Sequence, residues 1–131
     1  MTEHIDLSSL DSAARADEGA ALLLVHPATN EELGITVQLA GIDSAAHRRA
    51  VAAAANRRAK GGFRKQITLE QVQEENIETL AACTLAWEGV RVDGKDIAFS
   101  HAAAVSLYTR FPWLREQVEQ FISDRANYLQ D

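Results

Sequence analysis

Cysteine and long apolar runs are scarce in this sequence, and each scarcity excludes a class of structure. The one cysteine, Cys83, excludes a disulfide within the chain and fits a reducing compartment. No apolar run approaches the roughly 20 residues that a membrane-spanning helix needs. Residues 1–6 are acidic and lack the basic and apolar parts of a secretory signal. We therefore expect a protein that stays in a cytoplasm and does not enter a membrane.

Motifs for catalysis, cofactors and metals are also missing. No histidine pairs with another histidine, a cysteine or a carboxylate at the spacing of a zinc site; the four are His4, His26, His47 and His101. Cys83 is expected to be a buried small hydrophobe, and Glu74 and Glu75 diverge by about 100° on a helix, as in a solvated stripe. Neither a phosphate-binding glycine loop nor a nucleophile elbow occurs. The sequence predicts no enzyme, no cofactor and no metal site.

Charge is unevenly distributed. The formal net charge of -6 argues against a dedicated nucleic-acid binder. Between Asp43 and Glu70, however, every charged residue is basic. These residues are Arg48, Arg49, Arg57, Arg58, Lys60, Arg64 and Lys65. A single-stranded nucleic acid would also need exposed aromatic rings, and only Phe63 is near. We favour the alternative that this segment balances the acidic N-terminus and the glutamate-rich helix of this or a neighbouring subunit.

The chain of 131 residues is long enough for one domain with its own core. Three segments follow from its patterns: 1–42 with a β-hairpin, 43–65 with a basic alanine-rich helix and a hinge, and 66–131 as a helical body. The predicted fold class is α+β, mainly α.

The N-terminal half predicts a hairpin followed by a helix. The N-terminal residues fit either a short helix near 11–17 or a loosely docked terminus. Strands are expected over 20–26, a short apolar run that ends before proline, and over 33–39, where apolar and polar residues alternate. Asp43 or Ser44 can cap a helix that reaches Lys60. That helix is rich in alanine, so it either packs closely on a neighbour or projects from the body. Gly61 and Gly62 end it as a hinge or tight turn.

A long central helix is predicted next. Thr68 and Gln71 form a capping box, and Gly89 ends the helix. Its apolar residues return at spacings near three and four. They are Leu69, Val72, Leu80, Cys83 and Trp87.

The C-terminal third predicts a small hairpin and two helices. Asp93-Gly94 is a favoured two-residue hairpin turn, and Ser100 can cap a helix over 101–110. Phe111-Pro112 separates that helix from the last one. The last helix has a single apolar face formed by Leu114, Val118, Phe121, Ile122, Ala126 and Leu129.

Aromatic residues provide the best hypothesis for partner binding. Trp87, Phe111 and Trp113 are first of all expected in the core, but Trp113 lies off the apolar line of its helix and is expected to be partly exposed. The basic end of the alanine-rich helix is a second candidate region for partner binding. The candidate partner-binding residues are Phe111, Trp113, Arg57, Arg58 and Lys60.

Several stretches together resemble the small tail assembly chaperones of long-tailed bacteriophages and prophages. The resemblance rests on 67–71, 80–90, 111–118 and 124–129, and it extends to 26–31 and Asn56-Arg57-Arg58 in the front half. It implies a non-enzymatic protein of the bacterial host cytoplasm that self-associates. Its implied partner is the tape measure protein, kept soluble while tail tube subunits polymerise around it. The tail tube protein is a second possible partner.

Two alternatives stay open at this stage. One is a permanent virion component, such as a tail or neck adaptor, whose hairpins augment neighbouring sheets. The other is a small regulatory nucleic-acid binder that uses the segment from Arg48 to Lys65.

Overall fold

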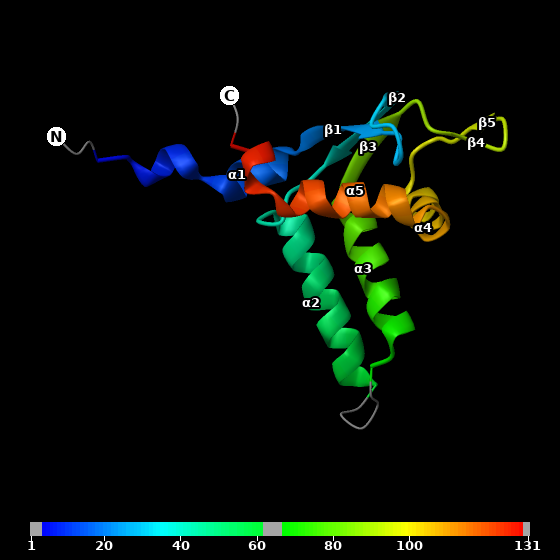
Figure 1. The fold of residues 1–131 in the computed structure, drawn as a ribbon. Coiled ribbons are helices and arrows are strands. Elements are labelled where there is room, and N and C mark those ends of the chain that lie inside the picture. The colour runs from blue at the N-terminus through cyan, green and yellow to red at the C-terminus, as the bar shows by residue number, and fades with distance from the viewer. Residues whose placement is uncertain (1–3, 62–66, 130–131) are drawn as a thin grey trace.

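Three antiparallel strands form the centre of the fold, which is α+β and mainly α (Figure 1). The structure is a computed structural model that describes residues 4–61 and 67–129. Strands β1 (Ala20–Val25) and β2 (Glu32–Leu39) make the predicted hairpin, and β3 (Thr84–Glu88) pairs with the other edge of β2. The sheet order is β1-β2-β3.

Strand β3 corrects the prediction of a helix that continues to Gly89. Helix α3 (Leu69–Cys83) has the predicted capping box between Thr68 and Gln71, but it ends at Cys83. Trp87 then lies opposite Val37 in the sheet. The spacing of Trp87 fits a helical stripe and an alternating strand equally well, and pairing with the edge of β2 selects the strand.

The first turns of α3 also differ from the prediction. Leu69 is 89% exposed and Val72 is 48% exposed, so neither belongs to the core. The buried face of α3 begins at Ile77 and continues through Leu80 to Cys83.

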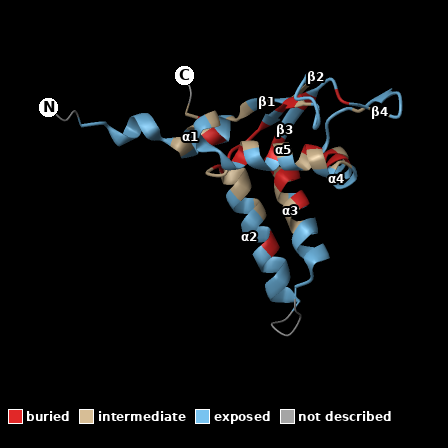
Figure 2. Cartoon of the chain, in the orientation of Figure 1, coloured by how far each residue is buried: buried red, intermediate tan, exposed pale blue. Residues whose placement is uncertain are grey.

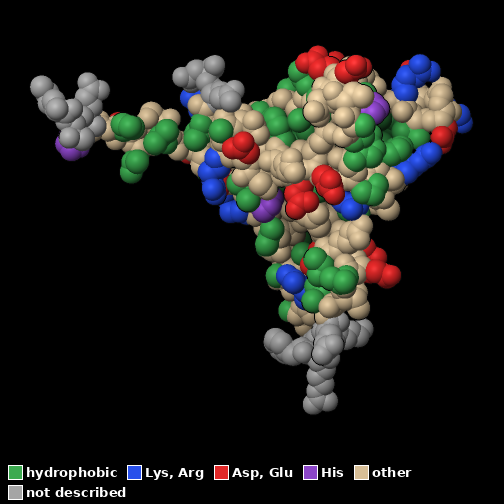
Figure 3. Space-filling model, viewed as in Figure 1, with side chains coloured by type: hydrophobic (Ala, Val, Ile, Leu, Met, Phe, Trp, Pro, Cys, Tyr) green, Lys and Arg blue, Asp and Glu red, His purple; other side chains and the backbone are tan. Residues whose placement is uncertain are grey.

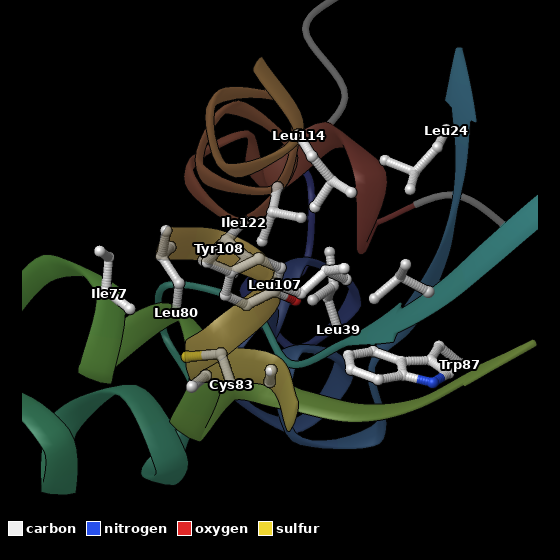
Figure 4. Packing of buried hydrophobic residues seen from close by; sticks show 14 of the residues in the cluster. Leu24, Leu39, Ile77, Leu80, Cys83, Trp87, Leu107, Tyr108, Leu114 and Ile122 are labelled. Atoms are coloured by element: carbon white, nitrogen blue, oxygen red, sulfur yellow. The ribbon is translucent and has the colours of Figure 1, made fainter. Parts of the chain in front are cut away.

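Helices α4 (His101–Arg110) and α5 (Pro112–Ser123) begin where predicted, at the Ser100 cap and at Pro112. Their buried side chains pack with α3 against one face of the sheet (Figure 4). The largest fully buried side chains include Tyr108, Leu24, Leu39, Ile122, Val37 and Val118. The opposite face of the sheet stays open, since Leu23 and Leu85 are 53% and 42% exposed.

Helix α5 is shorter than its apolar pattern predicted. It ends at Ser123, and Asp124 caps a 3-10 turn, η2 (Arg125–Asn127). Ala126 is exposed as a result, whereas Tyr128 turns back into the core.

Helix α2 (Ala45–Lys60) and α3 stand side by side as an arm that projects from the body (Figure 1). Both outcomes considered for the alanine-rich helix therefore occur, because α2 projects and also packs through alanine. Ala54 is its buried residue, and most of the arm is exposed (Figure 2). Helix α2 ends with Gly61 as its cap, and Gly62 lies outside the described residues.

Two smaller predictions are confirmed. The second hairpin consists of β4 (Arg91–Val92) and β5 (Lys95–Asp96), with Asp93 and Gly94 at φ values of 54° and 79° in its turn. The N-terminal helix is α1 (Ser12–Glu18), which Asp11 caps, and a 3-10 turn η1 (Leu7–Leu10) precedes it. No helix among the described residues is long and apolar enough to cross a membrane.

The turn between β2 and α2 connects distant parts of the chain. The N–H groups of Ala40, Gly41 and Ile42 donate to the carbonyls of Cys83, Ala16 and Ile122, respectively. The next residue, Asp43, receives two hydrogen bonds from the Arg125 guanidinium at 2.6 and 2.8 Å.

A buried hydroxyl pair links β3 to α4. Thr84 Oγ1 donates to the Leu80 carbonyl at 2.8 Å and lies 2.7 Å from the Tyr108 hydroxyl. Because the threonine proton is already used, Tyr108 is the donor to Thr84. Both polar groups are thereby satisfied inside the core.

A substitution at Gly89 tests how closely the end of β3 approaches β2 at Gly34. Its φ is +83°, and an added Cβ would lie 2.4 Å from the Gly34 carbonyl oxygen. We expect Gly89→Ala to lower the free energy of unfolding by roughly 3 kcal/mol or more, from backbone strain and the clash together. Gly94→Ala is the control, since its φ is +79° but nothing lies within 4 Å, and about 1–2 kcal/mol is expected. Equal losses of stability in urea titrations would contradict the clash.

Asp43 provides a pH test. Hydrogen bonds from Arg125 and then Ser12 lower the pKa of Asp43 from 3.8 to about 2. The ionised form is thus favoured in the folded state, so its stabilisation is complete above pH 3.8 and is lost as the pH falls toward 2. We expect Asp43→Asn to lower the free energy of unfolding by about 1 kcal/mol at neutral pH. The difference in this free energy between the variant and the wild type should become smaller as the pH falls from 3.8 toward 2. A gap that stays constant in urea titrations across this pH range contradicts the assignment.

Candidate partner-binding surface

The structure separates the five predicted partner-binding residues into two regions. Arg57, Arg58 and Lys60 lie in the last turn of α2, at the far end of the arm, whereas Phe111 and Trp113 lie at the junction of α4 and α5 in the body (Figure 1). Each region borders a different groove. The candidate surface is therefore two surfaces, which we describe in turn.

The first surface is the arm groove, a hollow of about 1050 Å³ between α2, α3 and α4. Its apolar lining comes from all three helices and includes Ala55, Ala59, Ile77 and Val105. Figure 3 shows how far the arm stands out from the body. Arg57 and Arg58 line the groove from α2. On the α3 side, three carboxylates line it, namely Glu74, Glu75 and Glu78.

Two ion pairs link side chains of these charged rims. Arg58 Nε lies 3.5 Å from Glu75 Oε1 and joins the two helices of the arm. His101 Nε2 lies 2.9 Å from Glu78 Oε2, between α4 and α3. Such exposed pairs contribute little to stability, on the order of 0–1 kcal/mol each. The groove consequently combines a fixed apolar lining with rims whose side chains can rearrange around a partner.

The second surface lies at the start of α5. The rings of Phe111 and Trp113 meet at an angle of 62° with centroids 6.3 Å apart, and the Arg110 guanidinium lies 5.2 Å from the Phe111 centroid. Arg110 also donates to both carboxylate oxygens of Asp93, at 2.9 and 3.2 Å, and this lowers the pKa of Asp93. The hairpin β4–β5 is thus tied to the end of α4.

Trp113 has the partial exposure that its sequence position predicted. It is half-buried and lines a second groove of about 470 Å³ between β1 and α5, which we call the strand groove. Trp87, in contrast, is 8% exposed. Its indole N–H donates to the Ile97 carbonyl at 2.8 Å, and its ring meets Phe99 edge to face at 5.1 Å.

Of the side chains considered for chemistry, Glu74 and Glu75 line the arm groove, whereas Cys83 and the four histidines line neither groove. Cys83 is fully buried, and burial raises the pKa of its thiol to about 11, so the thiolate that a nucleophile needs is disfavoured. The histidines His4, His26 and His101 are exposed, and His47 is half-buried. Among residues 4–61 and 67–129, no group of three His, Cys, Asp or Glu side chains could hold a metal ion.

Sequence reasoning missed the apolar lining of the arm groove. Ile77 is not among the apolar residues that the sequence pattern of α3 singles out. Only the packing of α4 beside α3 brings Ile77 and Val105 to one groove. A local signal exists in hindsight, because Val105 and Thr109 are one turn apart on α4 and present a mixed face.

The sequence and the structure were compared with known proteins. No protein-family model matches the chain, and no curated protein or solved structure matches it either.

The two tryptophans are expected to differ in their effect on stability. Trp87→Ala removes a buried ring and leaves the Ile97 carbonyl without its indole donor, so we expect a loss of about 3–5 kcal/mol. Trp113→Ala should cost about 1 kcal/mol and leave the fold intact. Urea unfolding followed by circular dichroism measures both. A larger loss for Trp113→Ala than for Trp87→Ala would reverse the assignment of core and surface.

Proposed function

We propose that this chain is a phage tail assembly chaperone that holds helical segments of the tape measure protein in solution while the tail tube assembles. The observation that carries the proposal is the arm groove, with its apolar lining and its rims of opposite charge. The resemblance of the sequence to tail assembly chaperones names the partner. The host cytoplasm is the corresponding location.

The dimensions of the groove support a helical partner. Its volume of about 1050 Å³ is at the upper limit of small-molecule sites, which span roughly 300–1,000 Å³. The apolar lining comes from Ala55 on α2, Ile77 on α3 and Val105 on α4, so it extends across three helices. An amphipathic helix binds such a groove by laying its apolar face on the lining and keeping its polar face in water.

The charges favour a protein partner over a nucleic acid. Arg57 and Arg58 would attract phosphates, but Glu74, Glu75 and Glu78 border the same groove and would repel them. The Arg58–Glu75 pair already uses one of the cations. An amphipathic helix that carries both signs of charge can match both rims, which selects its register on the groove.

A pair of substitutions in α2 tests the proposal. Ala55 and Ala53 are both exposed, but Ala55 lines the arm groove and Ala53, about 200° around the helix, does not. Ala55→Phe fills the groove, so we expect it to reduce the soluble yield of the tape measure protein encoded in the same genome when the two are co-expressed. Ala53→Phe is the matched control, because it makes the same alanine-to-phenylalanine change in α2 and so changes helix propensity equally. It should leave the soluble yield of the tape measure protein at the wild-type level.

Three results would count against this function. The tape measure protein is equally soluble without the chain, both substitutions act alike, or the chain is found by mass spectrometry in purified mature tails. The last result would favour a permanent virion component. Melting curves of both variants serve as the control for folding.

A further inference from the structure

Strand β1 is an edge strand whose own sequence has neither charged residues nor proline. In the part of the chain that the structure describes, the order β1-β2-β3 leaves one side of β1 without a strand neighbour. Edge strands of soluble proteins commonly carry charged residues or proline, which oppose pairing with another strand. Residues 20–25 read Ala-Ala-Leu-Leu-Leu-Val, with neither, and Leu23 is 53% exposed. This edge is chemically suited to accept another strand.

Gln117 of α5 shows which backbone groups face outward from the edge. Its side-chain amide donates to the Val25 carbonyl at 2.9 Å and accepts from the Val25 N–H at 3.1 Å. A residue of a neighbouring antiparallel strand makes this same pair of hydrogen bonds. The amide of Gln117 therefore stands in for one residue of a fourth strand.

Other residues of β1 also direct their backbone N–H and C=O groups away from β2. Backbone groups of alternate residues in a strand face the same side, so those of Ala21 and Leu23 face outward with those of Val25. The pairing of β1 with β2 shifts register between Leu23 and Val25, but burial alternates along β1, so β1 itself keeps its alternation. The residue after Val25, His26, has its backbone directed to the turn into β2, since its N–H donates to the Glu31 carbonyl and its carbonyl accepts from the Asn30 N–H.

The strand groove lies between this edge and α5. Its α5 side is a stripe at spacings of three and one, made of Trp113, Glu116, Gln117, Gln120, Phe121 and Asp124. This stripe runs the whole length of α5, about 18 Å for 12 residues, and β1 extends about 20 Å.

The lining predicts the chemistry of that segment. Glu116 and Asp124 are acidic, and no lysine or arginine lines the groove. The rings of Trp113 and Phe121 supply apolar contacts on the same side. Successive side chains of a strand point to opposite faces. A strand that alternates basic and apolar residues therefore directs its basic side chains toward α5, beside Glu116 and Asp124, and its apolar side chains toward the open face of the sheet, beside the exposed Leu23.

We propose that the β1 edge and the strand groove bind an extended partner segment of alternating basic and apolar residues, which adds to the sheet as a fourth strand next to β1. The segment pairs with Ala21 and Leu23 and displaces the amide of Gln117 from Val25. This site is separate from the arm groove and does not rest on the chaperone proposal.

The probe for this site is the synthetic peptide acetyl-Lys-Val-Arg-Val-Lys-Val-amide. We expect it to slow hydrogen exchange at the backbone N–H of Leu23 and to quench or shift the fluorescence of Trp113. A peptide with glutamate at the basic positions, and a peptide with N-methyl groups on alternate amides, should do neither. The first control tests the charge, and the second tests strand pairing.

Three variants of α5 refine the test. Gln117→Ala removes the competing amide, so the probe should bind roughly 2- to 10-fold tighter, the equivalent of one net hydrogen bond. Glu116→Gln should weaken binding by roughly 2- to 5-fold, as for one exposed charge pair. Glu119→Gln is the matched control, because this exposed carboxylate of α5 contacts Asn76 of α3 instead and should leave binding unchanged.

The proposal is overturned by any of three outcomes. The basic peptide leaves the exchange of Leu23 unchanged, the acidic peptide protects Leu23 equally, or Leu23 becomes protected with rising protein concentration when no peptide is present. The last outcome would assign the edge to a second copy of the chain. Ala55→Phe should not alter binding of the probe, so a failure here and a failure of the chaperone function are distinguishable.

Discussion

Three backbone hydrogen bonds in the turn after β2 hold this structure together. Ala40, Gly41 and Ile42 donate in succession to carbonyls at the end of α3, in α1 and in α5. The turn is so crowded that a Cβ on Gly41 would lie 2.9 Å from the Ala16 Cβ and 3.0 Å from the Tyr128 ring. Because these bonds join segments far apart in sequence, the sheet, the C-terminal helices and the base of the arm keep one relative arrangement. Both candidate surfaces depend on that arrangement.

Local signals predicted most of the elements. The caps at Ser44, Thr68 and Ser100 and the turn at Asp93-Gly94 are each specified by neighbouring residues, and the structure has them all. Strand β3 could not be found this way, because its residues continue the apolar spacing of α3. Only β2, more than 40 residues earlier, supplies the partner that makes Thr84–Glu88 a strand. The end of α5 was missed for a similar reason, since Tyr128 packs against Gly41 and Phe121.

The candidate surfaces were predictable only in part. Composition and position identified Trp113 and the basic end of α2, and the structure places each beside a groove. Which residues share a groove is a tertiary property. Thus Arg57 and Trp113, predicted together, lie in separate regions, whereas Val105 joins Arg57 through the packing of α4 on α3. The bonds between Gln117 and Val25 span 92 positions and have no local pattern.

The arm connects two neighbouring strands of the sheet. It starts and ends at adjacent points, since the N–H of Ala40 lies 2.7 Å from the Cys83 carbonyl and Leu39 pairs with Thr84. The strands β2 and β3 are consequently the two legs of one β-hairpin, and the whole helical arm is its loop. The entropic cost of closing a loop rises only slowly with the number of residues in the loop. Whole helical turns added to or removed from both helices would change the reach of the arm without moving the ends of either strand.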